Sequence, residues 1–280
     1  MSVIRKDLFE TVERMPAFPQ SVHRIIELTT DINSDPKVLV EVIQHDPILV
    51  MKILRLVNSP YFGLAQKITS INHAVVYIGI NTVKNLALST ATLGMLPRTN
   101  SAGFAMDAFL LHSLSTAIIA RILAKKLNVI ERDVFDFFLS GLLHDFGKIL
   151  FAHFMPQEFK KALLMAKDNG IRLYEAEREI LTADHTQIGS LLGEKWHLPP
   201  RIVACLKNHH NHDGEPSLIT DAVIAADQIS KDLKIGYSGE NIIEIIPDRI
   251  SERFGADMKG IIDSLGDIHA EIEKALIFIQ

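Results

Sequence analysis

Apolar residues recur every three to four positions along most of this chain, and few stretches alternate apolar with polar residues. The first spacing is that of one face of an α-helix, whereas a half-buried strand repeats every two residues. The chain also has few of the Gly-Asn or Asp-Gly pairs that close β-hairpins. These patterns predict an all-α fold.

Capping signals divide this pattern into helices. Asp35-Pro36 and Asp46-Pro47 each place a capping aspartate before a proline at the first helical position, and residues 184–187 form a capping-box pattern. The predicted helices are Gln20–Thr30, Pro36–Gln44, Pro47–Val57, Ile71–Ile78, Thr82–Leu93, Met106–Leu127, Val134–Phe154, Pro156–Asn169, Leu173–Leu181, Asp184–Trp196, Pro200–His210, Ser217–Leu233, Ile242–Phe254 and Asp257–Ile279.

The chain divides into three predicted parts. A polar break from Pro97 to Gly103 separates an N-terminal helical part, residues 1–98, from a central part, residues 99–235. The C-terminal extension, residues 236–280, carries weaker amphipathic patterns. Because isoleucines recur there at helical spacing, we expect residues 242–279 to be helical and to cover an apolar face.

Composition narrows the class of protein. A chain of 280 residues buries enough core to fold without a disulfide, and its single cysteine, Cys205, fits a reducing cytosol. Residues 1–15 lack the apolar stretch of a secretion signal. Arg121 interrupts the most apolar run, Ser115 to Leu123, so we expect a cytoplasmic protein with no membrane helix. The net charge of −5 and the lack of a basic stripe argue against nucleic acid as a partner.

The sharpest local signal is the run from Gly141 to Lys148 within an apolar helix. Burying His144, Asp145 and Lys148 there is costly unless each has a partner. His144 and Asp145 are roughly 100° apart on a helix and can straddle one metal, while Lys148 follows one turn later and can neutralise a bound phosphate. A buried ion pair between Asp145 and Lys148 explains the pattern equally well. Gly141 predicts a close approach of another helix.

Five further residues have the chemistry of metal ligands. His112 lies on a helix with small neighbours, His185 in a capped first turn and His209-His210 at a helix end, while Asp227 lies in a small, apolar run. Each histidine alone has a plain structural explanation, as a core residue, a solvent-facing residue or a helix cap.

Taken with the His-Asp pair, these residues supply five histidines and two aspartates from different helices. That set suits one or two ions held by nitrogen and oxygen ligands in the core of a helical bundle. The candidate metal ligands are His112, His144, Asp145, His185, His209, His210 and Asp227.

The order of these residues resembles the HD superfamily of metal-dependent phosphohydrolases. The interval from His112 to His144 and the His-Asp-x-Gly-Lys sequence ending at Lys148 are similar to the HD-GYP branch, in which extra histidines carry a second metal. The chain departs from that branch at residues 211–216, which contain no Gly-Tyr-Pro. Ala108, one turn before His112, offers no carboxylate for a third metal. The departure argues against cyclic-di-GMP hydrolysis.

The N-terminal third resembles HDOD proteins. The matching segments are Met15 to Pro19, Asp46-Pro47 through Leu54 to Ser59, Ala74 to Gly79, and Trp196 to Pro199. The resemblance covers about residues 12–235 and implies an HD-superfamily helical core at 99–235 behind an N-terminal HDOD helical subdomain at 1–98. HDOD proteins are linked to bacterial signalling, and many have lost metal ligands that this chain keeps.

Two functions follow from the resemblance, and a local pattern suggests a third. The first is a bacterial signal-transduction output module that retains a divalent-metal site, with a signalling protein or a nucleotide or other phosphoester as its partner. The second is a metal-dependent phosphohydrolase in which Asp145 and Lys148 take part in catalysis, Lys148 by stabilising phosphate charge. The third is a DNA-binding regulator, for which Lys84 is the one basic residue on the second helix of a segment like a helix-turn-helix.

The resemblance also implies how the ligands divide. The first ion would take His112, His144, Asp145 and Asp227, and Asp145 would bridge to a second ion on three further histidines. Fe, Mn, Ni, Zn and Mg are not distinguished by this set. The histidines assigned to the second ion are His185, His209 and His210.

Overall fold

The computed structural model describes residues 10, 12–30, 36–97, 99–212 and 214–280. Within these residues every regular element is a helix and none is a strand, so the predicted all-α fold is confirmed. The elements are α2 (Gln20–Thr30), α3 (Pro36–Gln44), α4 (Pro47–Val57), α5 (Ile71–Ile78), α6 (Ile80–Gly94), α7 (Met106–Lys126), α8 (Glu131–Leu143), α9 (Phe146–Phe154), α10 (Pro156–Asn169), α11 (Leu173–Leu181), α12 (His185–Lys195), α13 (Pro200–Asn208), α14 (Leu218–Asp232), α15 (Asp248–Phe254), α16 (Met258–Ser264), α17 (Ile268–Ala275) and the 3₁₀ helix η1 (Leu276–Phe278).

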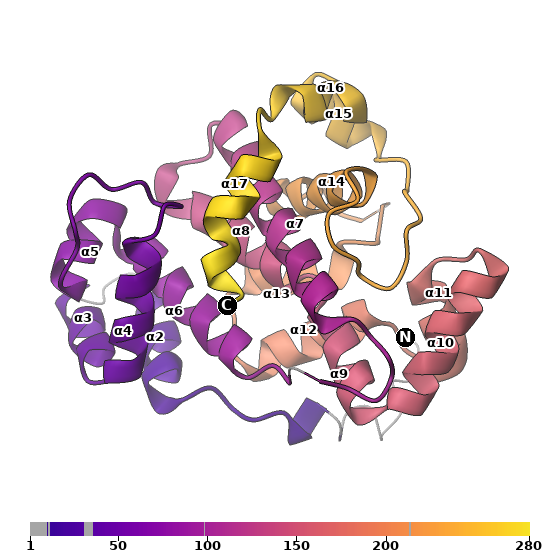
Figure 1. Ribbon diagram of the computed structural model, residues 1–280, viewed down its shortest axis with the longest axis horizontal. Coiled ribbons are helices and arrows are strands. Elements are labelled where there is room, and N and C mark those ends of the chain that lie inside the picture. Colours follow the sequence, from indigo (N-terminus) through magenta and orange to yellow (C-terminus); the bar gives the residue numbers. More distant parts are fainter. Residues whose placement is uncertain (1–9, 11, 31–35, 98, 213) are drawn as a thin grey trace.

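Helices α2 to α5 form one end of the molecule, α10 and α11 lie at the other, and α7 runs through the middle (Figure 1). Most helices begin and end within two residues of the predicted positions. At α4 the physical cause is visible, because the Asp46 carboxylate accepts the Leu49 N–H at 3.0 Å and caps the helix. The equivalent cap predicted at Asp35 lies outside the described residues.

The prediction of one continuous helix over Val134–Phe154 was wrong. The structure has two helices, α8 and α9, with His144 ending the first and Asp145 preceding the second. The His144 ring donates from Nδ1 to the carbonyl of Gly141 at 2.7 Å, and this carbonyl is the one that the Asp145 N–H would use in a continuous helix. The break between α8 and α9 therefore lies at His144-Asp145, the pair that the sequence analysis singled out as candidate ligands.

Two glycines let the core helices approach each other closely. A Cβ added at Gly141 would lie 2.8 Å from the Cα of Ala117, which confirms the predicted close approach and presses α8 against α7. A Cβ at Gly147 would lie 2.1 Å from the carbonyl oxygen of His185, which brings α9 against the start of α12. Because neither position has room for a side chain, both glycines set where the candidate ligands lie.

Helix α7 is the one helix of the described chain that is long and apolar enough to cross a membrane. The prediction that the sequence contains no such helix, based on Arg121 within the apolar run, was wrong by length and composition. In the structure, 72% of the apolar window is buried among other helices, which is the position of a core helix. Arg121 itself lies over the ring of Tyr61, with its guanidinium carbon 4.7 Å from the ring centroid.

The tail was predicted only in part. Residues 242–247 are not helical, and the predicted Asp257–Ile279 helix is divided into α16, α17 and η1, with Gly266 in the left-handed region at φ +76°. The later isoleucines do cover an apolar face, since Ile261 and Ile272 are buried. In the earlier part, the Glu244 side chain is buried and lies against Arg172, which directly precedes α11, as described below.

Candidate metal centre

Three core helices bring His112, His144 and Asp227 together. His112 lies in the middle of α7, His144 directly after α8 and Asp227 on α14. His112 Nε2 is 3.0 Å from Asp227 Oδ1, and His144 Nε2 is 3.7 Å from the same oxygen. All three side chains are buried and offer ligand atoms within 4.8 Å of one another, so they form a first group suited to one ion.

A second group consists of Asp145 and three histidines near helix ends. His185 begins α12, and His209 and His210 follow directly after α13. His185 Nε2 lies 3.1 Å from Asp145 Oδ1 and 3.1 Å from His210 Nε2, and His209 Nε2 lies 3.6 Å from Asp145 Oδ1. These four ligand atoms also lie within 4.8 Å of one another.

Asp145 lies between the two groups and faces one with each oxygen. Its Oδ2 is 3.3 Å from His144 Nε2 and 4.0 Å from His112 Nε2, on the side of the first group. Its Oδ1 faces the second group, nearest to His185. A carboxylate placed in this way can bridge two ions. The structure thus gathers all seven candidate ligands of the sequence analysis around one side chain.

The outer nitrogens of the rings are held by the protein. His144 donates from Nδ1 to Gly141, and His209 donates from Nδ1 to the carbonyl of Leu206 at 2.9 Å. With Nδ1 carrying the proton, Nε2 is left as the nitrogen with a free lone pair, and it points inward. Metal-binding histidines are oriented in this way by their outer hydrogen bonds.

Five of the inward atoms form no hydrogen bond within the described part of the chain. The buried nitrogens and oxygens that form no hydrogen bond there include His112 Nε2, His144 Nε2, Asp145 Oδ1, His209 Nε2 and Asp227 Oδ1. Buried polar atoms are normally hydrogen-bonded, so a converging set without partners calls for an explanation. Nitrogen and carboxylate donors facing one point fit divalent cations, and imidazole-rich sets favour transition metals.

A family model described as the HDOD domain matches residues 15–212, which is more than half of the chain. The chain belongs to the HDOD domain family. The predicted relationship is therefore confirmed.

Solved structures share the fold over nearly the whole HDOD chain. An HDOD domain protein of unknown function from Geobacter sulfurreducens is 22% identical, with a TM-score of 0.77 and 97% of each chain covered. A protein from Shewanella amazonensis SB2B with the provisional name of phosphohydrolase is 25% identical, with a TM-score of 0.76 and 98% of each chain covered. These similarities extend to the tail, which lies beyond the residues matched by the family model.

A curated relative from Treponema pallidum, named an uncharacterized protein, is 26% identical over 202 residues. The match covers 71% of this HDOD chain but only 39% of the relative, so this chain spans about two fifths of the relative's length.

The sequence analysis missed a carboxylate behind His185. Glu177 on α11 is fully buried, and its Oε2 lies 2.6 Å from His185 Nδ1 and accepts the His185 N–H at 2.8 Å. A carboxylate on the outer nitrogen fixes the ring and strengthens its other nitrogen as a ligand. The signal was present in the sequence, because Glu177 lies four residues from both Leu173 and Leu181 on the apolar face of one helix.

The ionisation of the rings differs within the centre. Burial disfavours the charged form of His144, but the carboxylates of Asp145 and Asp227 outweigh it and raise the His144 pKa to about 9. Burial also disfavours the charged form of His185, but the Glu177 carboxylate outweighs burial and raises the His185 pKa to about 9. For His209 burial dominates and lowers the pKa to about 4.

Lys148 is buried and pairs with the central carboxylate. Its Nζ donates to Asp145 Oδ2 at 2.7 Å, and the side chain is 1% exposed. This contact is the buried ion pair that the sequence analysis considered, and with the nearby histidines it keeps the pKa of Asp145 well below its ordinary value although burial opposes this. Lys148 therefore fixes the direction of the carboxylate between the two groups.

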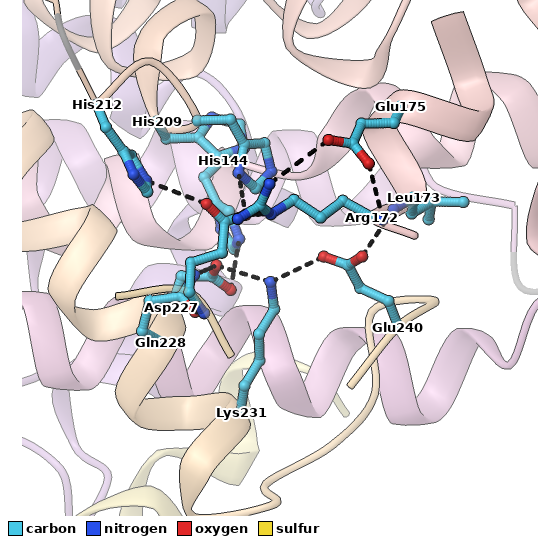
Figure 2. A network of polar contacts seen from close by, with 12 residues as sticks. His144, Arg172, Leu173, Glu175, His209, His212, Asp227, Gln228, Lys231 and Glu240 are labelled. Atoms are coloured by element: carbon cyan, nitrogen blue, oxygen red, sulfur yellow. Dashed lines mark hydrogen bonds and ion pairs between the residues drawn. The ribbon is translucent and has the colours of Figure 1, made fainter. Parts of the chain in front are cut away.

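A second buried lysine, Lys231, contacts Asp227 of the first group. Lys231 on α14 lies 3.0 Å from Asp227 Oδ2 and 3.2 Å from Glu240 Oε1, and Glu240 Oε2 accepts the Leu173 N–H at 2.6 Å (Figure 2). Residues from α14, the tail and the start of α11 thus meet beside Asp227. Neither residue was predicted from the sequence: Lys231 lies four residues after Asp227 on α14, a spacing that could have indicated the pair, whereas Glu240 meets Leu173 from a distant part of the chain.

Proposed function

We propose that this HDOD domain is a signal-transduction module built around a buried centre for two divalent transition-metal ions. One observation carries the proposal: the two oxygens of Asp145 face two separate sets of inward ligand atoms. Asp145, His112, His144 and Asp227 would hold the first ion, and Asp145 with three histidines would hold the second. The second-ion histidines are His185, His209 and His210.

Burial of the centre favours a regulatory module over an open active site. His112, His144, Asp145 and His185 are each at most 1% exposed, and an enzyme must bring its substrate within reach of such groups. The N-terminal helices in turn expose apolar side chains suited to a protein partner. These exposed residues are Ile48, Met51, Val76 and Tyr77. In this proposal residues 1–98 contact the partner, 99–235 hold the ions and 236–280 close the centre.

The second candidate is a metal-dependent phosphohydrolase, and the position of Asp145 favours it. Two ions bridged by a carboxylate can polarise a phosphoryl oxygen and lower the pKa of a bound water. The protein's own contribution would be to orient Asp145 through Lys148 and to hold the histidine rings in place. This function requires the centre to open.

The structure weakens the DNA-binding alternative. Lys84, the one basic residue available to the second helix of that segment, is only 5% exposed on α6. Phosphate contacts need exposed cations.

Elemental analysis of protein purified without added metal tests the proposal. We expect about two transition-metal ions per chain, and none after replacement of Asp145 by Ala. A parent protein that is folded but free of metal, and that binds none when Mn²⁺, Fe²⁺ or Ni²⁺ is added, would falsify the proposed centre. Turnover of a generic phosphodiester by the metal-loaded protein would select the hydrolase over the regulatory module.

A further inference from the structure

The segment of residues 236–247, in the connection from α14 to α15, has no helical structure and lies beside His210 of the second ligand group. Two hydrogen bonds from its backbone tie it down: the Tyr237 N–H donates to the carbonyl of Ala108 at 2.9 Å, and the Glu244 N–H donates to Gln228 Oε1 at 2.6 Å. The segment therefore connects α7 and α14, the helices that carry His112 and Asp227.

At the centre of this segment, the usual arrangement of apolar side chains inside and charged side chains outside is reversed. Glu244 is buried at 3% exposure, whereas its neighbours Ile243 and Ile245 are 46% and 91% exposed. A segment that only covered the core would bury the isoleucines and leave the acid in water, because burial favours apolar groups and penalises a charge. The inward carboxylate thus specifies where this segment lies.

The Glu244 carboxylate lies among three nitrogen groups from two other parts of the chain. Its Oε1 is 3.2 Å from Arg172 Nε and 3.7 Å from His210 Nδ1, and its Oε2 is 3.3 Å from His212 Nε2. Arg172 precedes α11, and the two histidines follow α13. Figure 2 shows Arg172 and His212 reaching this point from opposite sides. Such a set of donors receives an oxyanion.

This oxyanion position adjoins the metal centre. His210 takes part in both, because its Nδ1 faces Glu244 while its Nε2 faces His185 at 3.1 Å. A ligand with several oxygens placed at Glu244 would therefore lie on the outer side of a candidate metal ligand. Arginine is well suited to phosphoryl groups, and Arg172 faces Glu244 with Nε while its Nη1 faces Glu175 Oε1 at 3.5 Å.

We propose that Arg172, His210 and His212 form a subsite for the phosphoryl group of a small phosphoester, and that Glu244 occupies this subsite and closes it. The inference deepens the proposed function, and rests on it, by naming the ligand class and the residue that blocks access. A phosphoryl group would displace the Glu244 carboxylate and release residues 241–247. Glu240 would stay bound to Lys231 and to the Leu173 N–H.

Calorimetric titration with inorganic phosphate tests the subsite in metal-free and metal-loaded protein alike. Glu244→Gln keeps the size of the side chain but removes the competing charge, so we expect phosphate to bind at least tenfold more tightly than to the parent. Glu252→Gln, an exposed acid on α15, is the matched control and is expected to bind as the parent does. Adding Arg172→Ala to the Glu244 variant is expected to abolish the gain.

Hydrogen exchange of the parent protein provides a test that needs no variant. Phosphate is expected to speed exchange of residues 241–247, while acetate at the same ionic strength leaves it unchanged. The inference is overturned by equal phosphate affinity in parent and Glu244→Gln, by a gain that survives Arg172→Ala, or by acetate acting as strongly as phosphate. Elemental analysis of the same samples distinguishes failure of the phosphoryl subsite from failure of the proposed metal centre. A protein with the expected metal content but no response to phosphate would reject only the subsite.

Discussion

The two ligand groups on either side of Asp145 differ in charge and in where their residues lie. The first group has a carboxylate of its own, Asp227, and two histidines, while the second has three histidines and shares only Asp145. Carboxylates bring negative charge that offsets the cation, and imidazoles bring none. In the proposed centre we therefore expect the first group to be the stronger site for a doubly charged ion, and the second to be the more selective for transition metals.

The groups also differ in how rigidly the fold holds them. Two of the three residues of the first group, His112 and Asp227, project from within α7 and α14, long helices buried on most sides, and only His144 follows a helix end. His185, His209 and His210 occupy helix ends, where the ring positions depend on single contacts such as that with Glu177. Helix interiors place side chains more precisely than ends, which fray more easily. The first group thus resembles a fixed site, and the second a site that its neighbours can adjust.

Replacing Asp145 removes what the groups share and has the largest expected effect. Asp145→Ala is expected to lose both ions, and to reduce the free energy of unfolding by about 3–5 kcal/mol because Lys148 stays buried without its partner. Metal content and the melting temperature measure the two effects. Asp263→Ala, at an exposed site on α16, is the control and should change neither. Retention of one ion by the Asp145 variant would show that the groups are independent.

Removing two histidines of the second group separates it from the first. The double variant His185→Ala, His209→Ala is expected to bind about one ion fewer per chain while keeping the helical content of the parent. The double variant His153→Ala, His269→Ala replaces two exposed histidines and should keep the parental metal content. An unchanged metal content in the first variant would reject the second group as a site.

The sequence predicted most helices and every candidate ligand of the two groups, but not the residues that contact those ligands from outside. Helix starts such as Asp46-Pro47 depend on neighbouring residues, so local reasoning finds them. The break at His144 depends on a side chain competing for a backbone carbonyl, which helical spacing does not reveal. That these residues bind metal stays a prediction.

The tail and the outer contacts of the site could not be predicted because they depend on distant partners. Glu240 contacts the backbone of Leu173, and Glu244 lies against Arg172, more than 60 residues earlier in the chain. Isoleucine spacing alone predicted a helix over 242–254, of which only α15 forms, and in the irregular part Glu244 is buried against Arg172. Only the folded chain shows that acids at these positions face inward.

Glu177→Gln tests whether the second group depends on its outer contact. The amide keeps the shape of the side chain but removes the negative charge beside His185 Nδ1, and loss of such a partner weakens metal binding by about 10- to 100-fold. The first group makes no use of Glu177, so its affinity should stay that of the parent. Competition with a chromophoric chelator resolves the two affinities. Glu179→Gln, two residues later on α11, is the control, and equal weakening of both ions would contradict the difference between the groups.

The last expected effect is the gradual dependence of metal affinity on pH, which is at most about tenfold per pH unit. In the metal-free protein the pKa values of His144 and His185 are raised from 6.5 to about 9. Each ring therefore carries a second proton and a positive charge at pH 7, and a bound ion must displace this second proton. His209, with its pKa lowered to about 4, is already neutral. Each group therefore releases about one proton per ion, and each affinity should rise up to about tenfold per pH unit from pH 7 to about pH 9 and then level off.

The same shifts give the metal-free protein the opposite trend in stability. A histidine whose pKa is higher in the folded than in the unfolded chain stabilises the fold fully below pH 6.5, and this contribution is lost as pH rises through about 9.

Chelator competition at pH 7, 8 and 9, with a dye recording proton release in weak buffer, measures how the metal affinity depends on pH. Because the His185 shift depends on Glu177 and the His144 shift on the aspartates, Glu177→Gln should flatten the pH dependence of the second ion alone. Loss of the slope for both ions would mean that the groups titrate as one unit, and no slope in the parent would mean that neither ring is protonated before metal binds.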